Sequence, residues 1–233
     1  DDGQYHAWTE INVPQRPFEI ENVDTVTVPL AQSGYTTEYL RYRITINDRP
    51  NETNYYRIVI DKQTTLWGYN HEEGGDDYIY WTKHSYNFIG REDVVLTDGQ
   101  PTTGDDEDNG LFDTAKNIYG VFDDTRFRNT SYTMTVYNNT KIETGSDSGY
   151  FSGMDVIIRL MSITETEYYY LKALNLVDSD AYDETINEPI KYPSNVHGGT
   201  GMVGISTEVT QTIHIISSSH SKGNLAPPVH VYQ

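Results

Sequence analysis

The chain has 233 residues, enough for one large domain or two small domains with a sizeable core. Its 35 acidic and 16 basic residues give a formal net charge of −19, and a field of that sign repels phosphate groups, which argues against nucleic acid or anionic lipid as a partner. Cysteine is absent, which excludes disulfide frameworks, thiolate metal sites and cysteine nucleophiles.

Apolar and polar residues alternate with a period of two along much of the chain, which is typical of half-buried strands. The pattern recurs six times, in residues 40–46, 56–60, 132–136, 154–160, 203–207 and 213–215. Clusters of turn-forming residues separate the runs, as at 47–51 and 97–99. Many short strands of this kind predict a mainly β fold, either an antiparallel β-sandwich or a partly open barrel.

One principal α-helix is predicted at about residues 165–177. Thr164 and Glu167 form a capping-box pattern, in which the threonine hydroxyl and the glutamate carboxylate bond the free backbone N–H groups at the start of a helix. Four apolar residues follow at the spacing i, i+3, i+4 and i+7: Tyr170, Ala173, Leu174 and Val177. We expect this helix to pack on a sheet and to bury Tyr170, Leu174 and Val177.

The segment 199–204 matches the dinucleotide fingerprint G-x-G-x-x-G, but its surroundings do not fit that function. The fingerprint needs a strand before it and a helix after it. Here a proline-containing loop precedes the glycines, and a β-branched stretch at 205–212 follows them. A tight loop leading into a strand is therefore the better interpretation.

The acidic run at 105–113 resembles a calcium-binding loop. Asp105, Glu107, Asn109 and Asp113 occupy positions 1, 3, 5 and 9 of that template, with glycine at the sharp-turn position. Position 12 is Lys116, where the template requires a bidentate glutamate. Two interpretations stay open: a solvated acidic loop, which is the ordinary role of a charge run, and a Ca²⁺ site. We expect no other cofactor.

Five aromatic residues form the best candidate for a ligand-binding surface. This aromatic cluster consists of Trp67, Tyr69, Tyr78, Tyr80 and Trp81, and it brackets the glycine-rich acidic loop 70–77. Flat rings with polar atoms stack on sugars and pack on peptides. The alternative is that these residues fill sheet faces, for which tyrosine and tryptophan have a high propensity.

The sequence offers no positive case for catalysis, and we expect the protein not to be an enzyme. The seven histidines do not form H-E-x-x-H or another metal-ligand spacing. A serine nucleophile elbow is absent, because Asp147 stands where Gly145-Ser146-Asp147-Ser148-Gly149 would need serine. A hydrolase that uses carboxylates distant in sequence stays open as an alternative.

Four groups of sequence motifs follow one another along the chain. Ile46-Asn47-Asp48-Arg49-Pro50 precedes Asn54-Tyr55-Tyr56-Arg57, and Phe122-Asp123-Asp124-Thr125-Arg126-Phe127 follows, continued by Arg128-Asn129. Next, Val156-Ile157-Ile158-Arg159-Leu160 leads through Ile163-Thr164 to Tyr168-Tyr169-Tyr170. The last group is Glu188-Pro189 with Ser194-Asn195-Val196-His197-Gly198-Gly199-Thr200-Gly201. We call residues 194–201 the signature loop.

These motifs resemble an outer-membrane lipoprotein family from Bacteroidetes-type outer membranes, catalogued as domain of unknown function 4249. The resemblance spans about residues 8–206, and its most specific part is the signature loop, above all Asn195, Gly198, Gly199 and Gly201. One departure is Arg128-Asn129, where the family has Asn-Gly. Another is the long acidic stretch 98–110.

The resemblance implies a division of the chain and an anchor. Residues 1–17 would be the last strand of an N-terminal β-domain plus a linker, and residues 18–233 the β-rich C-terminal domain of the family. A lipid anchor on a cysteine upstream of Asp1 would be the only attachment to the membrane.

The resemblance also implies a function, because members often accompany SusC/SusD-type TonB-dependent receptors. We therefore expect a non-enzymatic, cell-surface accessory binding component of outer-membrane nutrient uptake. Its partner would be a TonB-dependent receptor or another surface protein, and its ligand a glycan or a peptide. Two alternatives stay open besides the hydrolase: an adhesion or structural subunit of a surface appendage, and a calcium-dependent carbohydrate-binding module.

Overall fold

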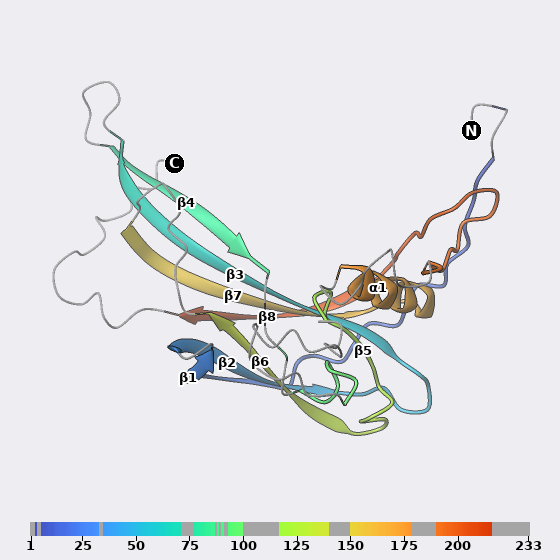
Figure 1. The fold of residues 1–233 in the computed structure, drawn as a ribbon, viewed down its shortest axis with the longest axis horizontal. Coiled ribbons are helices and arrows are strands. Elements are labelled where there is room, and N and C mark those ends of the chain that lie inside the picture. The colour runs from blue at the N-terminus through green and yellow to red at the C-terminus, as the bar shows by residue number, and fades with distance from the viewer. Residues whose placement is uncertain are drawn as a thin grey trace. The chain divides into compact units, whose positions relative to one another are not determined.

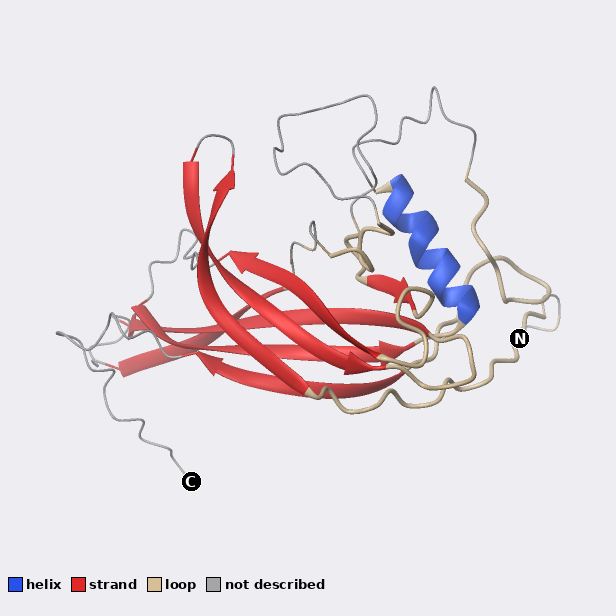
Figure 2. Ribbon diagram, turned by 90° about the horizontal axis from the view of Figure 1, so that it is seen from below, coloured by secondary structure: helices blue, strands red, loops and turns tan. Residues whose placement is uncertain are grey.

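The structure is a computed structural model that describes residues 3, 6–32, 35–70, 77–86, 88, 90, 93–99, 117–139, 150–178 and 190–215. Within these residues the elements are β1 (Asn22–Gln32), β2 (Tyr35–Asn47), β3 (Tyr55–Asn70), β4 (Asp77–Ser85), β5 (Val121–Asp123), β6 (Ser131–Asn139), β7 (Tyr150–Ser162), α1 (Glu165–Val177) and β8 (Thr207–Ile215). Figures 1 and 2 show the predominance of strands. The predicted mainly β class with one principal helix is confirmed.

The strands form two antiparallel sheets. One sheet has the order β1-β2-β6, and the other has the order β4-β3-β7-β8, with β5 paired to β3. Neither sheet closes on itself within the described part of the chain, and two separate sheets are consistent with the predicted sandwich.

The chain divides into two compact units, each described below by itself. The first comprises residues 1–59, 87–140 and 159–210, and the second comprises residues 60–86, 141–158 and 211–233. Strands β3, β7 and β8 contribute residues to both units.

The first unit contains the sheet β1-β2-β6 and its apolar face. Tyr42 pairs with Val136, and Ile44 pairs with Met134, and all four side chains are fully buried. The alternation expected at 40–46 and 132–136 is therefore confirmed. Strand β1 was not expected from the apolar pattern, and it tolerates Pro29 because it lies at a sheet edge.

Aromatic rings join the end of the second sheet to β6 within the same unit. Tyr56 in β3 stacks on Phe122 in β5, with ring centroids 5.4 Å apart. Phe127 lies against both rings and against Tyr132 at the start of β6. These contacts form a continuous aromatic core across β3, β5 and β6, and aromatic pairs of this kind add to the stabilisation that burial supplies.

The second unit contains the hairpin of β3 and β4. Leu66 in β3 pairs with Trp81 in β4, and Leu66 is fully buried. On the neighbouring strand β7, Val156 and Ile158 are fully buried, as their alternation predicts. The buried carboxylate of Asp61 lies 3.0 Å from Nδ1 of the half-exposed His84.

Helix α1 begins and ends where the sequence predicts. The Thr164 hydroxyl accepts a hydrogen bond from the backbone N–H of Glu167 at 3.2 Å, which is the first half of the capping box. Burial raises the pKa of Glu167, and Oε2 of its carboxylate is buried without a hydrogen-bond partner among the described residues. This oxygen therefore does not supply the second half of the predicted capping box.

The buried face of α1 differs from the predicted one. The buried residues are Tyr168, Leu171 and Asn175, whereas Tyr170 and Leu174 are only partly buried against the same cluster. Asn175 belongs to the buried face because its side chain bonds Asn117 and the backbone N–H of Tyr119. A pattern based on apolar residues cannot identify such a position. The predicted docking is confirmed, because α1 lies beside β5 (Figure 1).

Residues 203–206 do not form the strand that their alternation predicts, because β8 begins at Thr207. Side chains hold this segment instead: Asn195 bonds both the N–H and the carbonyl of Val203. A Cβ added at Gly204 would lie 2.7 Å from the carboxylate of Glu167, so this glycine allows the chain to pass close to α1. None of the helices in the described residues is long and apolar enough to span a membrane.

Candidate functional site

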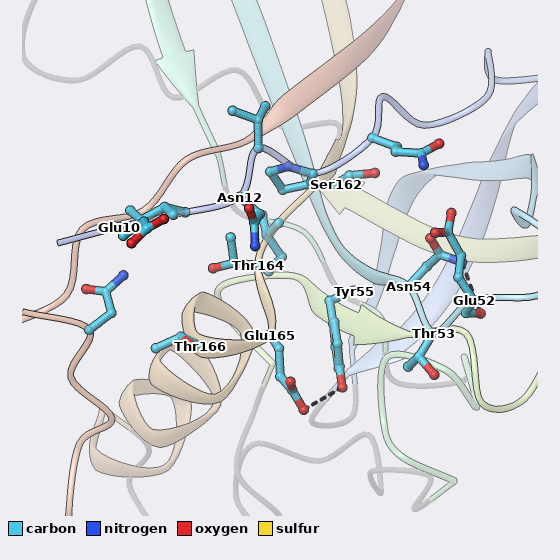
Figure 3. Close-up of a pocket in the computed structure, with 16 residues that line it drawn as sticks. Glu10, Asn12, Glu52, Thr53, Asn54, Tyr55, Ser162, Thr164, Glu165 and Thr166 are labelled. Atoms are coloured by element: carbon cyan, nitrogen blue, oxygen red, sulfur yellow. Dashed lines mark hydrogen bonds between the residues drawn. The ribbon is translucent and has the colours of Figure 1, made fainter.

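A pocket of about 500 Å³ lies in the first unit (Figure 3). Four segments line it: residues 10–15, residues 52–55, residues 162–166 and Asn195. They come from the N-terminal segment, the β2–β3 connection, the junction of β7 with α1, and the signature loop. The pocket therefore depends on the fold to bring distant parts of the chain together.

The signature loop and the N-terminal segment hold each other at one side of the pocket. Trp8 and His197 exchange two backbone hydrogen bonds of 3.1 and 2.8 Å, and their rings stack with centroids 4.2 Å apart. The hydroxyl of Thr9 donates a hydrogen bond of 2.6 Å to the carbonyl of Asn195. These contacts fix residues 10–15, which continue directly into the pocket wall.

Glycines of the signature loop have a structural role in this arrangement. Gly198 has φ +75°, and a Cβ there would lie 2.2 Å from the carbonyl oxygen of His6. Gly201 has φ +127°, and Gly199 lies close to Ala7 and Val196. Of the four signature residues singled out in the sequence, only Asn195 is part of the pocket wall.

A polar cluster of Asp48, Asn54, Asp124, Arg128 and Asn129 fixes the β2–β3 connection. Asp124 is fully buried and accepts hydrogen bonds from the backbone N–H of Asn54 at 2.9 Å and from the Arg128 guanidinium at 3.1 Å. Asp48 is also buried and accepts from the backbone N–H of Asn129 at 2.8 Å. Burial raises the pKa of Asp48, and the charge of Asp124 raises it further, whereas the Asn129 hydrogen bond opposes the shift.

The departure at Arg128-Asn129 fits this cluster. Asn129 has φ +60°, a conformation that asparagine tolerates better than other residues with a Cβ. Its side-chain oxygen also accepts a hydrogen bond from the backbone N–H of Asn51. Arg128 adds an ion pair to Asp124, so both substituted positions make contacts that hold the turn.

Tyr55 and Glu165 meet at the floor of the pocket shown in Figure 3. The phenol of Tyr55 donates a hydrogen bond of 2.9 Å to Oε1 of Glu165. Burial, together with the hydrogen bond and the charge of Glu165, raises the pKa of Tyr55 above its usual range. The phenol therefore stays protonated and remains a donor at neutral pH.

Three glutamates give the pocket its charge: Glu10, Glu52 and Glu165. All three are exposed, and the described residues that line the pocket include no lysine, arginine or histidine. The chain has 35 acidic residues, and nothing in its sequence pattern distinguishes these three from the others.

Ser162 is a further lining residue that the sequence analysis missed. Its side chain is 5% exposed, and its hydroxyl has no hydrogen-bond partner among the described residues. The sequence does carry a signal, because Ser162 continues the inward register of Met154, Val156, Ile158 and Leu160 with a polar residue. A polar side chain at such a position usually has a partner.

Of the aromatic cluster, the two described side chains, Tyr80 and Trp81, are not among the residues that line this pocket. The register pairs Trp67 with Tyr80 and Tyr69 with Tyr78 across β3 and β4. Since successive residues of a strand belong to opposite faces, Trp81 is on the other face from Tyr80. The side chains of Trp67, Tyr69 and Tyr78 lie outside those that the structure describes, so a role of the cluster in binding stays a prediction.

The predicted calcium ligands Asp105, Glu107, Asn109 and Asp113 lie outside the described residues. Elsewhere, within the residues that the structure describes, no group of three or more histidine, aspartate or glutamate side chains has an arrangement that could hold a metal ion. The calcium site therefore stays a prediction.

Fold and pocket together define a β-rich protein with an open, polar, acidic pocket. The family model described as Domain of unknown function (DUF4249) matches residues 1–212, so the chain belongs to this family. The resemblance seen in the sequence motifs is thereby confirmed. A search of curated proteins found no significant match.

Proposed function

We propose that this protein is a non-enzymatic binding component of nutrient uptake, held at the cell surface of an outer membrane by a lipid anchor upstream of Asp1. Its partner would be a TonB-dependent receptor or another surface protein. Its ligand, a glycan or a peptide fragment, would occupy the pocket described above.

One observation supports the pocket as the place of recognition. Three motifs that carry the family resemblance each contribute to its wall: Asn54-Tyr55 from the first, Ile163-Thr164 from the third and Asn195 from the last. The first of these motifs lies more than 100 residues before the other two in the chain, yet all three meet around one open space. Ligand sites are typically concave and carry a few convergent polar groups, and this pocket has both properties.

The lining suits recognition of a polar ligand. Amide, hydroxyl and carboxylate groups dominate the wall, and Tyr55 adds an aromatic ring with a phenol donor. Such groups form directional hydrogen bonds to a sugar or a peptide, whereas apolar residues such as Ile11 and the exposed Val13 contribute contact area. Recognition by these groups needs no catalytic step.

A blocked pocket provides the test for ligand recognition. Asn12 is an exposed residue of the pocket wall, so Asn12→Trp fills the space without disturbing buried residues. Binding to a panel of neutral oligosaccharides and short peptides is measured by calorimetry with the unaltered chain. We expect Asn12→Trp to abolish binding and Thr27→Trp, on the exposed side of β1, to leave it unchanged. Equal binding to both variants would place recognition elsewhere.

Co-purification tests the proposed partner separately. The TonB-dependent receptors of the native host are tagged one at a time, and this protein is sought in each purified complex. We expect a stable complex whose recovery does not depend on ligand. Purification of every receptor without this protein, in cells that contain both, would contradict the role in uptake.

A further inference from the structure

We propose that the pocket takes an extended organic cation with two separated positive groups, such as a diamine or a peptide with two basic side chains. The inference rests on the proposed function, because it names the ligand class of the same pocket.

The charge of the wall is the first argument. Within the described part of the chain, the carboxylates of Glu10 and Glu52 take part in no hydrogen bond or ion pair, and Glu165 accepts only the phenol of Tyr55. Three carboxylates around one open space attract positive charge, and each retains oxygen atoms that can accept hydrogen bonds.

Two arginines touch lining residues from outside the pocket, but each has other partners. Arg128 bonds the hydroxyl of Thr53 and is ion-paired with the fully buried Asp124. Arg49 bonds the side chain of Gln15, and its guanidinium lies 4.9 Å from the ring centroid of Phe18. Neither arginine lines the pocket, so the wall itself stays acidic.

The spacing of the carboxylates distinguishes an extended organic cation from a metal ion. In Figure 3, Glu10 and Glu52 lie on opposite sides of the pocket, with Glu165 below and between them. A metal ion needs its oxygen ligands converging on one point, within about 2.6 Å for Ca²⁺. The three glutamates do not form such a group, whereas a chain with amino groups at its two ends can reach separate carboxylates.

Ser162 is the second, independent argument for a ligand. Its side chain is in the pocket wall and 95% buried, yet its hydroxyl has no partner among the described residues. Leaving a buried hydroxyl without a hydrogen bond costs free energy. A ligand in the pocket, or a water that bridges the hydroxyl to a ligand, would supply the missing hydrogen bond and would explain why a serine is present in the wall. A hydroxyl can accept a hydrogen bond from an ammonium or a guanidinium group.

A pair of probes with the same length and different charge tests the proposal. We use 1,5-diaminopentane and 1,5-pentanediol, and we measure binding to the full chain by calorimetry at low and high salt. We expect the diamine to bind at least about ten times more tightly than the diol, because only the diamine is charged, and its affinity to fall as salt screens the charges.

Variants of the glutamates locate the binding. Glu10→Gln and Glu52→Gln should each weaken diamine binding by about two- to fivefold, as expected for exposed ion pairs, and the combination with Glu165→Gln should weaken it by about tenfold or more. The control is Glu208→Gln, an exposed glutamate outside the pocket, which should have no effect. Because Glu165 also holds Tyr55, the Glu10→Gln/Glu52→Gln double variant is the safer test if the triple variant folds poorly.

Ser162→Ala separates a binding role from a structural one. The hydroxyl has no hydrogen-bond partner among the described residues, so its removal should leave the melting temperature unchanged or raised. We expect diamine binding to weaken by about three- to fivefold at the same time. Unchanged affinity would remove the serine from the proposed site.

Three other outcomes would overturn the proposal. The first is that the diamine and the diol bind with equal affinity. The second is that the glutamate variants bind the diamine as tightly as the unaltered chain does. The third is that CaCl₂ displaces the diamine and that the binding of Ca²⁺ is weakened by the same three glutamate substitutions. A neutral oligosaccharide that binds and is blocked by Asn12→Trp, with no diamine binding, would also overturn it and would leave the proposed function intact. Loss of the receptor complex would instead count against the proposed function alone.

Discussion

The phenol of Tyr55 donates a hydrogen bond of 2.9 Å to the carboxylate of Glu165, a residue 110 positions away. Tyr55 is the first residue of β3, and Glu165 is the first residue of α1. The ring of Tyr55 also packs on Tyr168, one turn further along the helix, with centroids 5.0 Å apart. One side chain thus fixes the start of α1 against the second sheet and forms part of the pocket wall.

We expect Tyr55→Phe to reduce the free energy of unfolding by about 0.5–1 kcal/mol, because it removes one hydrogen bond to a charged but exposed group and keeps the ring. Urea denaturation measures the change. Tyr169→Phe is the matched control, because Tyr169 is an exposed tyrosine of α1 whose ring lies near that of Tyr55. An equal loss in both variants would show that the Tyr55 hydrogen bond has no special weight.

Asp124 should be among the most sensitive polar residues of the first unit. Asp124→Ala removes the acceptor of the Asn54 backbone N–H and the partner of Arg128, so we expect a loss of about 2–4 kcal/mol in the free energy of unfolding. Asp155→Ala is the control, because Asp155 is half-exposed and its carboxylate bonds the exposed His214. Asp155→Ala should reduce the free energy of unfolding by less than about 1 kcal/mol. A similar loss for Asp124→Ala and Asp155→Ala would contradict the expectation that the buried carboxylate contributes more.

Alkaline pH should destabilise the protein through its buried tyrosines. Burial raises the pKa of Tyr42 and of Tyr56 above the usual value of about 10, so their folded forms keep the proton when the unfolded chain has lost it. The stability that they contribute is complete below about pH 10 and is lost as the pH rises. The expected slope is about 1.4 kcal/mol per pH unit for each phenol.

Urea denaturation between pH 9 and pH 11 checks this slope. Tyr42→Phe should reduce the slope by the share of one phenol without loss of stability at neutral pH, because the hydroxyl of Tyr42 has no hydrogen-bond partner among the described residues. Tyr86→Phe, at an exposed position, is the control and should leave the slope unchanged. An unaltered slope in Tyr42→Phe would mean that this phenol does not titrate as burial predicts.

Gly198→Ala should release the N-terminal segment from the signature loop. Alanine is strained at φ +75°, and its Cβ would collide with the carbonyl of His6. We expect the amide protons of Trp8 and His197 to exchange with solvent much faster, which nuclear magnetic resonance measures for each amide. Gly153→Ala is the control, because a Cβ there meets nothing within 4 Å. Unchanged protection in Gly198→Ala would contradict this role of the glycine.

Much of the fold follows from local patterns that the sequence carries. Alternation at 40–46, 132–136 and 154–160 predicts three strands correctly, because each strand half-buries one face and every second residue must then be apolar. Helix α1 is found at the predicted position of about residues 165–177, since Thr164 caps it and the apolar spacing follows. The strand prediction fails at 203–206 because a distant side chain overrides the local pattern: Asn195 bonds Val203 and holds a segment that has strand periodicity.

The sequence by itself determined the mainly β class, helix α1, several of the strands, the acidic charge and the family, because periodicity, composition and motifs are properties of short stretches of chain. Only the tertiary structure decided that residues 10–15, 52–55, 162–166 and Asn195 surround one pocket. It also decided that Asn175 is buried and that Ser162 is buried without a partner. The physical reason is that the surroundings of a polar side chain depend on segments far away in the chain. No local pattern therefore distinguishes the three glutamates from the other acidic residues, and the register of β7 indicates that Ser162 is buried but not whether its hydroxyl has a partner.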